Sequence, residues 1–198
     1  MIAKIHQFWN WFVQQEAQFR QIQDEEGVRE LLNNQILSLG RFAWGIDRGR
    51  QKRFALTFSP NNDHRLLALS KQIVEAAPDL PYWEFHACRP PDLYWDFKFQ
   101  TFNNFMVLQT FDAAKWQFVL IEEEDYRIRI EIKADNMATL DLDDQNIEAE
   151  RAVTRLLGDE LRIEEVHSVA IVHRFDPLDQ DWVYNMRELR KRFLYFIE

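Results

Sequence analysis

Residues 116–133, WQFVLIEEEDYRIRIEIK, contain two runs in which large apolar residues recur at every second position. Side chains two positions apart on a β-strand point to the same face, so each run predicts a strand with an apolar face. The link between the runs, residues 122–125, is short and acidic, which favours antiparallel pairing. The stretch therefore predicts a β-hairpin with strands over about 115–122 and 126–133.

The same two-residue period recurs along the chain, and aromatic residues, which make up 14% of the sequence, fill many of its positions. Trp44, Phe54 and Phe58 are examples, and we expect their side chains to point into the core. The pattern predicts further strands over residues 41–47, 52–59, 82–88, 105–111 and 166–174.

Between these strands, apolar residues three and four positions apart predict amphipathic helices. Gly40 and Gly158 fit positions just past a helix end, and Pro78 ends another helix because proline lacks a backbone donor. The predicted helices cover about residues 3–24, 28–39, 66–74, 147–157 and 182–197.

These segments show no internal repeat and no linker. They predict an α+β fold, with a single, mostly antiparallel sheet of about six to seven strands and helices packed on its apolar face. A chain of 198 residues can bury one substantial core. We therefore expect one compact domain over residues 1–198.

Composition limits the classes of partner. The net charge of −9 disfavours nucleic acid, whose phosphates attract clustered cations, but is compatible with a basic protein. The apolar runs are too short to cross a bilayer, and residues 1–6 lack the apolar core of a signal peptide. The single cysteine, Cys88, excludes an internal disulfide framework. We expect an acidic cytoplasmic protein that binds neither nucleic acid nor membrane.

Sequence patterns of the common catalytic and cofactor sites do not occur. The chain contains no GxGxxG, GxSxG, HExxH or CxxC, and the P-loop-like spacing of Gly40 and Gly45 lacks the lysine that binds phosphate. His167 and His173 lie six positions apart on one predicted strand, too far to share an ion. We therefore expect no cofactor and no metal.

The polar face of the predicted sheet supplies the candidate site. Glu84, His86 and Cys88 share one strand face, where Glu84 and His86 could act as acid and base, and Cys88 as a nucleophile. Arg127 and Arg129 could hold an anionic ligand, with Arg53 on a neighbouring strand. The alternatives are a solvated sheet face and an inert thiol at Cys88.

A dense aromatic tract, residues 93–105, offers a second candidate surface. Tyr94 and Trp95 lie in it, and aromatic side chains commonly anchor protein interfaces. The tract could contact a partner protein or a second copy of the chain. The alternative is a lid over the sheet edge, which would hide this apolar area.

Three phrases together resemble an uncharacterised bacterial family, a domain of unknown function. They are FWNWF at 8–12, EAAP at 75–78 leading to WEF at 83–85, and LLGDE at 156–160. The resemblance implies a small bacterial cytosolic protein and assigns no functional residue.

Two functional hypotheses follow. The first is a non-catalytic binding or protein-interaction module, for example an immunity-type protein that neutralises a basic partner; the absent catalytic motifs, acidic charge and aromatic excess favour it. The second is a small enzyme or anionic-ligand binder that uses the polar sheet face. Homodimerisation through the aromatic tract is a further hypothesis.

Overall fold

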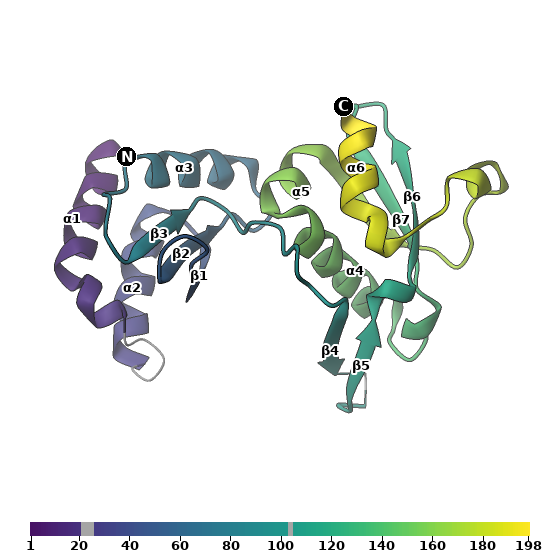
Figure 1. Ribbon diagram of the computed structural model, residues 1–198, viewed down its shortest axis with the longest axis horizontal. Coiled ribbons are helices and arrows are strands. Elements are labelled where there is room, and N and C mark those ends of the chain that lie inside the picture. The colour runs from purple at the N-terminus through teal and green to yellow at the C-terminus, as the bar shows by residue number, and fades with distance from the viewer. Residues whose placement is uncertain (21–25, 103–104) are drawn as a thin grey trace. The chain divides into compact units, whose positions relative to one another are not determined.

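The computed structural model describes residues 1–20, 26–102 and 105–198 (Figure 1). The chain divides into two compact units, Met1–Arg89 and Pro90–Glu198, and each is described by itself. The single domain predicted over residues 1–198 stays a prediction, because two compact units can still unfold together.

The first unit joins a helical pair to a small mixed sheet. The sheet order is β1-β2-β3, with β1 and β2 antiparallel and β2 and β3 parallel. Helix α3 makes the crossover between the two parallel strands, which a short turn could not do. The elements are α1 (Ile2–Phe19), α2 (Glu26–Leu39), β1 (Ala43–Arg48), β2 (Phe54–Ser59), α3 (His64–Glu75) and β3 (Trp83–His86).

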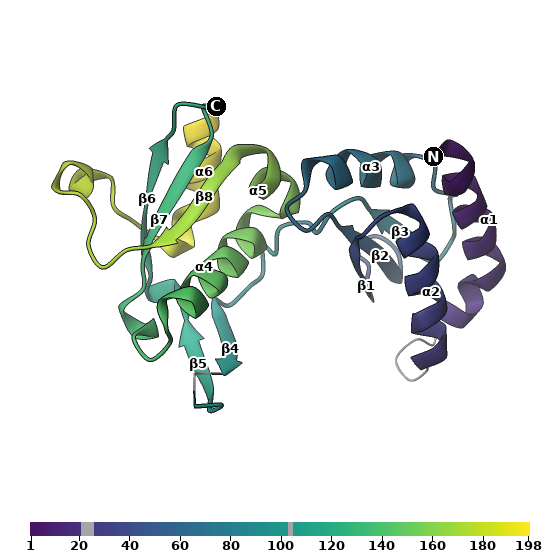
Figure 2. The same cartoon turned by 180° about the vertical axis from the view of Figure 1, so that it is seen from behind.

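The core of this unit lies where α1 and α2 meet the apolar face of the sheet. Ile5, Phe8 and Phe12 recur at helical spacing and form the buried stripe of α1. Leu56 and Phe58 face the core from β2 and are fully buried. Figure 2 shows α1 and α2 side by side.

Buried indoles tie distant segments of the first unit together. The Nε1 atom of Trp9 donates to the backbone carbonyl of Ile73, at 2.7 Å, and so links α1 to α3. That of Trp83 donates to Glu16, at 2.8 Å, and links β3 to α1. Each ring thus fills the core while its polar atom is satisfied.

The second unit contains a hairpin and a four-stranded sheet. The hairpin pairs β4 with β5. The sheet has the order β8-β7-β6-β9, in which only β7 and β8 are parallel among the described residues. Its elements are β4 (Lys98–Phe102), β5 (Leu108–Asp112), β6 (Gln117–Glu122), β7 (Ile128–Lys133), α4 (Leu142–Leu157), α5 (Asp159–Glu165), β8 (Val166–Ile171), β9 (Tyr184–Asn185) and α6 (Leu189–Ile197), with short 3₁₀ turns between them.

Helices α4 and α6 contribute to one core with this sheet. Phe118, Ile130 and Ile132 face it from β6 and β7, while Val153 and Phe193 project from the two helices. All five are fully buried. The hairpin predicted from residues 116–133 is confirmed, with Leu120 opposite Ile130.

The single sheet predicted from the sequence is wrong. The described strands form separate sheets of three, two and four strands, although the α+β class is right. Alternation identifies the buried face of a strand but does not identify its neighbour. The predicted strand over 105–111 is β5, shifted by a few residues, and its partner β4 lies in the aromatic tract, where the alternation predicted no strand.

The two units repeat one strand topology. In each, an antiparallel hairpin is followed by a helical crossover, and the returning strand pairs in parallel with the second hairpin strand. The first unit uses β1, β2, α3 and β3 for this arrangement, and the second uses β6, β7, α4–α5 and β8. The repeat is one of topology, because the two segments share no sequence pattern.

A matched pair of core variants tests whether the units unfold independently. Phe58→Ala and Phe118→Ala each empty a fully buried position in one unit, and each should cost about 3–5 kcal/mol. We expect hydrogen-exchange mass spectrometry to show lost protection in residues 1–89 for Phe58→Ala and in 90–198 for Phe118→Ala. Loss of protection throughout the chain in both variants would instead support the single domain predicted from the sequence.

Candidate functional site

The first polar cluster surrounds the Glu84 carboxylate. Glu84 lies on β3 between core residues, so its side chain turns to the opposite face, toward the loop that joins β1 to β2. One oxygen, Oε1, accepts the backbone N–H of Arg50 at 2.7 Å. The other, Oε2, accepts those of Gln51 at 2.7 Å and Lys52 at 2.9 Å. The carboxylate therefore fixes the loop.

The same contacts decide the charge of Glu84. Burial acts to raise its pKa, but the hydrogen bonds from the backbone of residues 50–52, together with that from His86, outweigh burial and lower the pKa to about 2. His86 Nε2 lies 3.0 Å from Oε1. A carboxylate with so low a pKa is a poor proton acceptor at neutral pH. These contacts favour a structural role for Glu84 over acid–base chemistry.

The loop approaches Glu84 so closely that position 49 requires glycine. A Cβ atom there would lie 2.4 Å from the backbone oxygen of Lys52 and 2.9 Å from Glu84 Cδ. Lys52 itself forms an ion pair with Asp79 and donates to the carbonyl of Leu80 at 2.9 Å. Arg53 is exposed, with its guanidinium 5.2 Å from the ring centre of Phe54.

Cys88 follows the strand that carries Glu84 and His86. Strand β3 ends at His86, and the half-buried Cys88 follows it, so the strand predicted over 82–88 is shorter than expected. His86 Nε2 contacts the Glu84 carboxylate, which gives the imidazole a partner other than the Cys88 thiol. The predicted roles of these three residues stay predictions.

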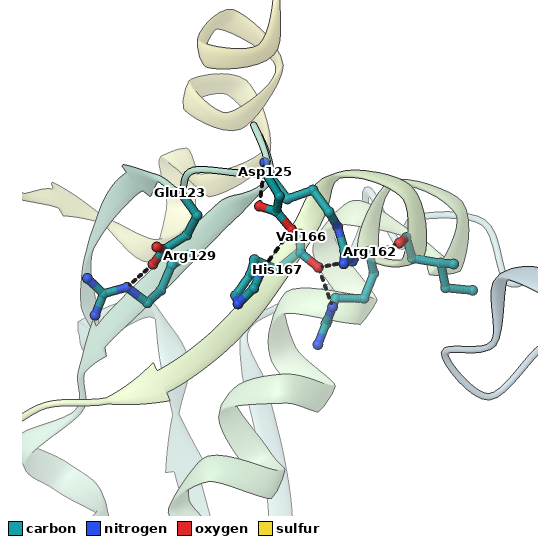
Figure 3. Close-up of polar contacts among 8 residues, drawn as sticks. Glu123, Asp125, Arg129, Arg162, Val166 and His167 are labelled. Atoms are coloured by element: carbon teal, nitrogen blue, oxygen red, sulfur yellow. Dashed lines mark hydrogen bonds and ion pairs between the residues drawn. The ribbon is translucent and has the colours of Figure 1, made fainter.

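The second polar cluster lies at the β6–β7 turn, in the other unit (Figure 3). Arg129 stands between two glutamates: its Nε donates to Glu123 at 2.6 Å and its Nη1 to Glu131 at 2.5 Å. Beside it, Asp125 lies 3.1 Å from Nδ1 of His167 on β8. The hydrogen bond from His167 is the main cause that lowers the pKa of Asp125.

Two arginines hold the junction between α5 and β8. Nη2 of Arg127 donates to the carbonyls of Ile163, at 3.1 Å, and Val166, at 2.5 Å. Arg162 donates to the same Val166 carbonyl at 3.1 Å and forms a bidentate pair with Glu150. Figure 3 shows Arg162 and His167 on either side of Val166. Sequence reasoning missed Arg162, since a buried arginine carries no local pattern.

The structure separates the predicted site residues. Arg53, Glu84 and His86 belong to the first unit, whereas Arg127 and Arg129 belong to the second, so no single sheet face joins them. On β7, Arg129 points away from the core face occupied by Ile128 and Ile130, as the alternation predicted, whereas Arg127 precedes the strand. Both arginines are already engaged by protein groups.

The two aromatic residues predicted for the site, Tyr94 and Trp95, differ in their solvent exposure. Tyr94 is 97% exposed. Trp95 is buried, its ring stacks on Phe97 with 5.1 Å between ring centres, and its Nε1 donates to the carbonyl of Lys98 at 3.0 Å. The guanidinium of Arg155 lies 4.8 Å from the Trp95 ring. Trp95 is thus a core residue, and Tyr94 is available to a partner.

The described part of the chain contains no cluster of metal ligands: no group of three or more His, Cys, Asp or Glu side chains there could hold a metal ion. Over the same residues, none of the helices combines the length and apolar character needed to span a bilayer.

Comparisons with known proteins give no assignment. No family model, curated protein or solved structure matches the chain. The resemblance to an uncharacterised bacterial family stays a prediction.

The Glu84 cluster makes a prediction about stability. Glu84→Gln keeps the shape of the side chain but removes the charge and replaces one acceptor oxygen by a donor, which leaves backbone N–H groups unpaired. We expect a loss of about 1–3 kcal/mol in the free energy of unfolding, measured by urea denaturation at pH 7. Glu30→Gln, an exposed site on α2, is the control and should leave stability unchanged.

The pH dependence has a defined sign. Because folding lowers the pKa of Glu84 from 4.5 to about 2, its ionised form stabilises the protein above pH 4.5, and this contribution is lost between pH 4.5 and 2. The difference between wild type and Glu84→Gln should therefore shrink over that interval. A difference that stays constant down to pH 2.5 would contradict the role assigned to Glu84.

Proposed function

We propose that this chain is a protein-binding module rather than an enzyme, and that its second unit engages a basic partner protein. The observation that carries the proposal is the far end of the β4–β5 hairpin. Five large apolar side chains gather there, each between 51% and 84% exposed: Phe102, Phe105, Met106, Val107 and Leu108. We call these residues the hairpin end. Clustered exposed apolar side chains of this kind are typical of protein-interaction sites.

The other end of the hairpin is anchored in the core. Phe99 stacks on Phe111 across the strands, with ring centres 5.5 Å apart, and packs edge-on against Trp116 at 5.7 Å. An isolated two-stranded hairpin is marginally stable, so this anchor holds it in place. In Figure 1, β4 and β5 extend away from the four-stranded sheet. The aromatic tract thus divides between a buried lid and an exposed end.

The net charge of the second unit indicates the sign of the net charge expected of its partner. Residues 90–198 contain 13 Lys and Arg against 23 Asp and Glu, a net charge of −10, whereas residues 1–89 carry +1. Long-range attraction therefore favours a basic protein and should raise its association rate at low salt. This distribution supports the immunity-type role predicted from the sequence.

The alternative, an enzyme or anionic-ligand binder, has weaker support. Its acid–base candidate, Glu84, is engaged by three backbone N–H groups. Its anion-binding candidates are engaged as well, Arg127 by backbone carbonyls and Arg129 by two carboxylates.

Affinity capture with matched variants tests the proposal. The full chain is used as bait with quantitative mass spectrometry, as wild type, as the double variant Phe105→Ser/Met106→Ser, and as the control Leu178→Ser. Leu178 is 87% exposed on the 3₁₀ turn Pro177–Trp182, away from the hairpin in sequence. We expect a basic protein to be retained by wild type and control and lost from the double variant.

Calorimetry with the captured protein should then give a dissociation constant that weakens by about tenfold or more in the double variant and also weakens with added salt. Equal binding by wild type and the double variant, or retention of acidic proteins only, would contradict the proposal. A dimer seen by light scattering that the double variant abolishes would instead support homodimerisation.

A further inference from the structure

Strand β1 offers unpaired backbone groups at the edge of the first sheet. It pairs with β2 alone among the described strands. In an antiparallel pair, residues whose N–H and C=O point to the partner alternate with residues whose groups point away. The N–H of Gly49 donates to the carbonyl of Arg53 at 3.3 Å and so fixes this alternation.

The register counted from that bond shows which residues direct their backbone N–H and C=O groups toward β2, namely Asp47, Gly45 and Ala43. Trp44 and Ile46, on the intervening positions, direct theirs outward. The hydrogen bonds of β2 agree with this alternation. Phe54, which lies opposite Arg48, points its N–H away from β1 and donates to the carbonyl of Tyr82 at 2.9 Å. The outer edge of β1 therefore presents donors and acceptors in the spacing that an added strand requires.

The equivalent edge in the second unit is occupied. In the repeated topology β6 corresponds to β1, and its outer side pairs with β9, Gln117 with Asn185 and Phe118 with Tyr184. Side chains cover the other edge strand of that sheet, β8, where the N–H of Ile171 donates to Asn146 on α4 at 2.8 Å. At the start of β8, the carbonyl of Val166 accepts from Arg127 and Arg162. Proteins usually blunt exposed edges in such ways. The two repeated topologies thus differ in whether another described strand pairs with the outer side of the first hairpin strand, β1 or β6.

The surroundings of β1 indicate what it would pair with. On the helix side, Trp44 and Ile46 are half-buried at the margin of the core. Trp44 donates to Asn33 of α2 at 3.1 Å, and the guanidinium of Arg29 lies 5.9 Å from its ring centre. On the opposite face, Ala43 and Gly45 present little bulk.

Positive charge lies at both ends of this edge. Arg48 ends β1 and Arg41 precedes it, and both are exposed, as is Arg29 on α2. Asp47 is the one acidic residue of the strand, and it projects to the face opposite Trp44 and Ile46. Arg48 shares the face of Trp44 and Ile46, and Arg29 lies beside Trp44. These two arginines make the edge cationic on the side where apolar contact is available, in a chain whose net charge is −9.

We propose that β1 binds an extended acidic segment of a partner protein, which adds to the sheet as a fourth strand. Backbone hydrogen bonds to Trp44 and Ile46 supply the pairing. An apolar side chain of the segment packs on these two residues, and carboxylates beside it pair with Arg48, Arg29 or Arg41. This site is independent of the hairpin end, which lies in the other unit and has the opposite charge preference.

The probe is a fluorescein-labelled peptide, Ac-TETVTET-NH₂, titrated into the full-length protein and followed by fluorescence anisotropy. In a strand its valine and both glutamates lie on one face, as the site requires. Two control peptides accompany it: TKTVTKT, with reversed charge, and TETVPET, whose proline removes a backbone donor and disfavours strand pairing. We expect binding of the first peptide only. In amide NMR spectra, the shifts that it causes should centre on residues 41–48.

Three protein variants locate the site. Ile46→Pro removes an outward N–H without removing a β1–β2 hydrogen bond, and should abolish binding. Arg48→Glu should weaken binding by about tenfold or more while leaving the fold intact. Arg65→Glu, an exposed site on α3, is the matched control and should bind as wild type. Arg48→Glu keeps the test decisive if Ile46→Pro does not fold.

Three results would overturn the proposal. The first is no binding of TETVTET to wild type at low salt, and the second is equal binding of all three peptides. The third is a wild-type dimer, seen by light scattering, that Ile46→Pro or Arg48→Glu converts to monomer, because the edge would then take a second copy of the chain. Loss of the hairpin-end partner in the Phe105→Ser/Met106→Ser variant leaves these measurements unaffected, so the two proposals fail separately.

Discussion

Each unit depends on one strand that is hydrogen-bonded on both sides. Strand β2 pairs with β1 and β3, and β7 pairs with β6 and β8. Neither strand therefore leaves its backbone N–H and C=O groups unpaired in the core. Their apolar side chains, such as Phe58 and Ile130, are fully buried under the helices. The parallel partner requires a helical crossover, and that crossover is what brings α3 and α4 to their sheets. The rest of each unit follows from this arrangement.

Several polar side chains that the sequence suggested as functional residues instead hold the loops and junctions around these strands. Glu84 closes the loop before β2, and Arg127 closes the junction before β8. Buried or half-buried charges of this kind are costly unless their hydrogen bonds are satisfied, so their partners are close and specific. The groups that we propose to engage partners are of a different kind, namely apolar side chains at a hairpin end and backbone groups at a strand edge.

The sequence predicted local structure better than assembly. Residues 116–133 form the expected hairpin because alternation and a short turn are both local signals. Nothing in residues 82–88 says that they pair in parallel with β2, because that neighbour is chosen by the crossover and the core. Likewise, alternation placed Arg129 outward, but its pairs with Glu123 and Glu131 depend on how long side chains bend across the turn. Because alternation does not identify strand neighbours, the sequence predicted one site from residues that the structure assigns to different sheets.

The positions of the tryptophans determine the intrinsic fluorescence of the protein. Trp9 and Trp83 are buried in the first unit, and Trp95 and Trp116 in the second, each with its indole N–H bonded to a protein acceptor. Indoles in such dry surroundings emit at shorter wavelength than indoles in water. Intrinsic fluorescence of the whole chain is a sum over seven tryptophans in the two units. Replacing all four of the first unit, Trp9, Trp11, Trp44 and Trp83, by phenylalanine would leave emission from the second unit alone.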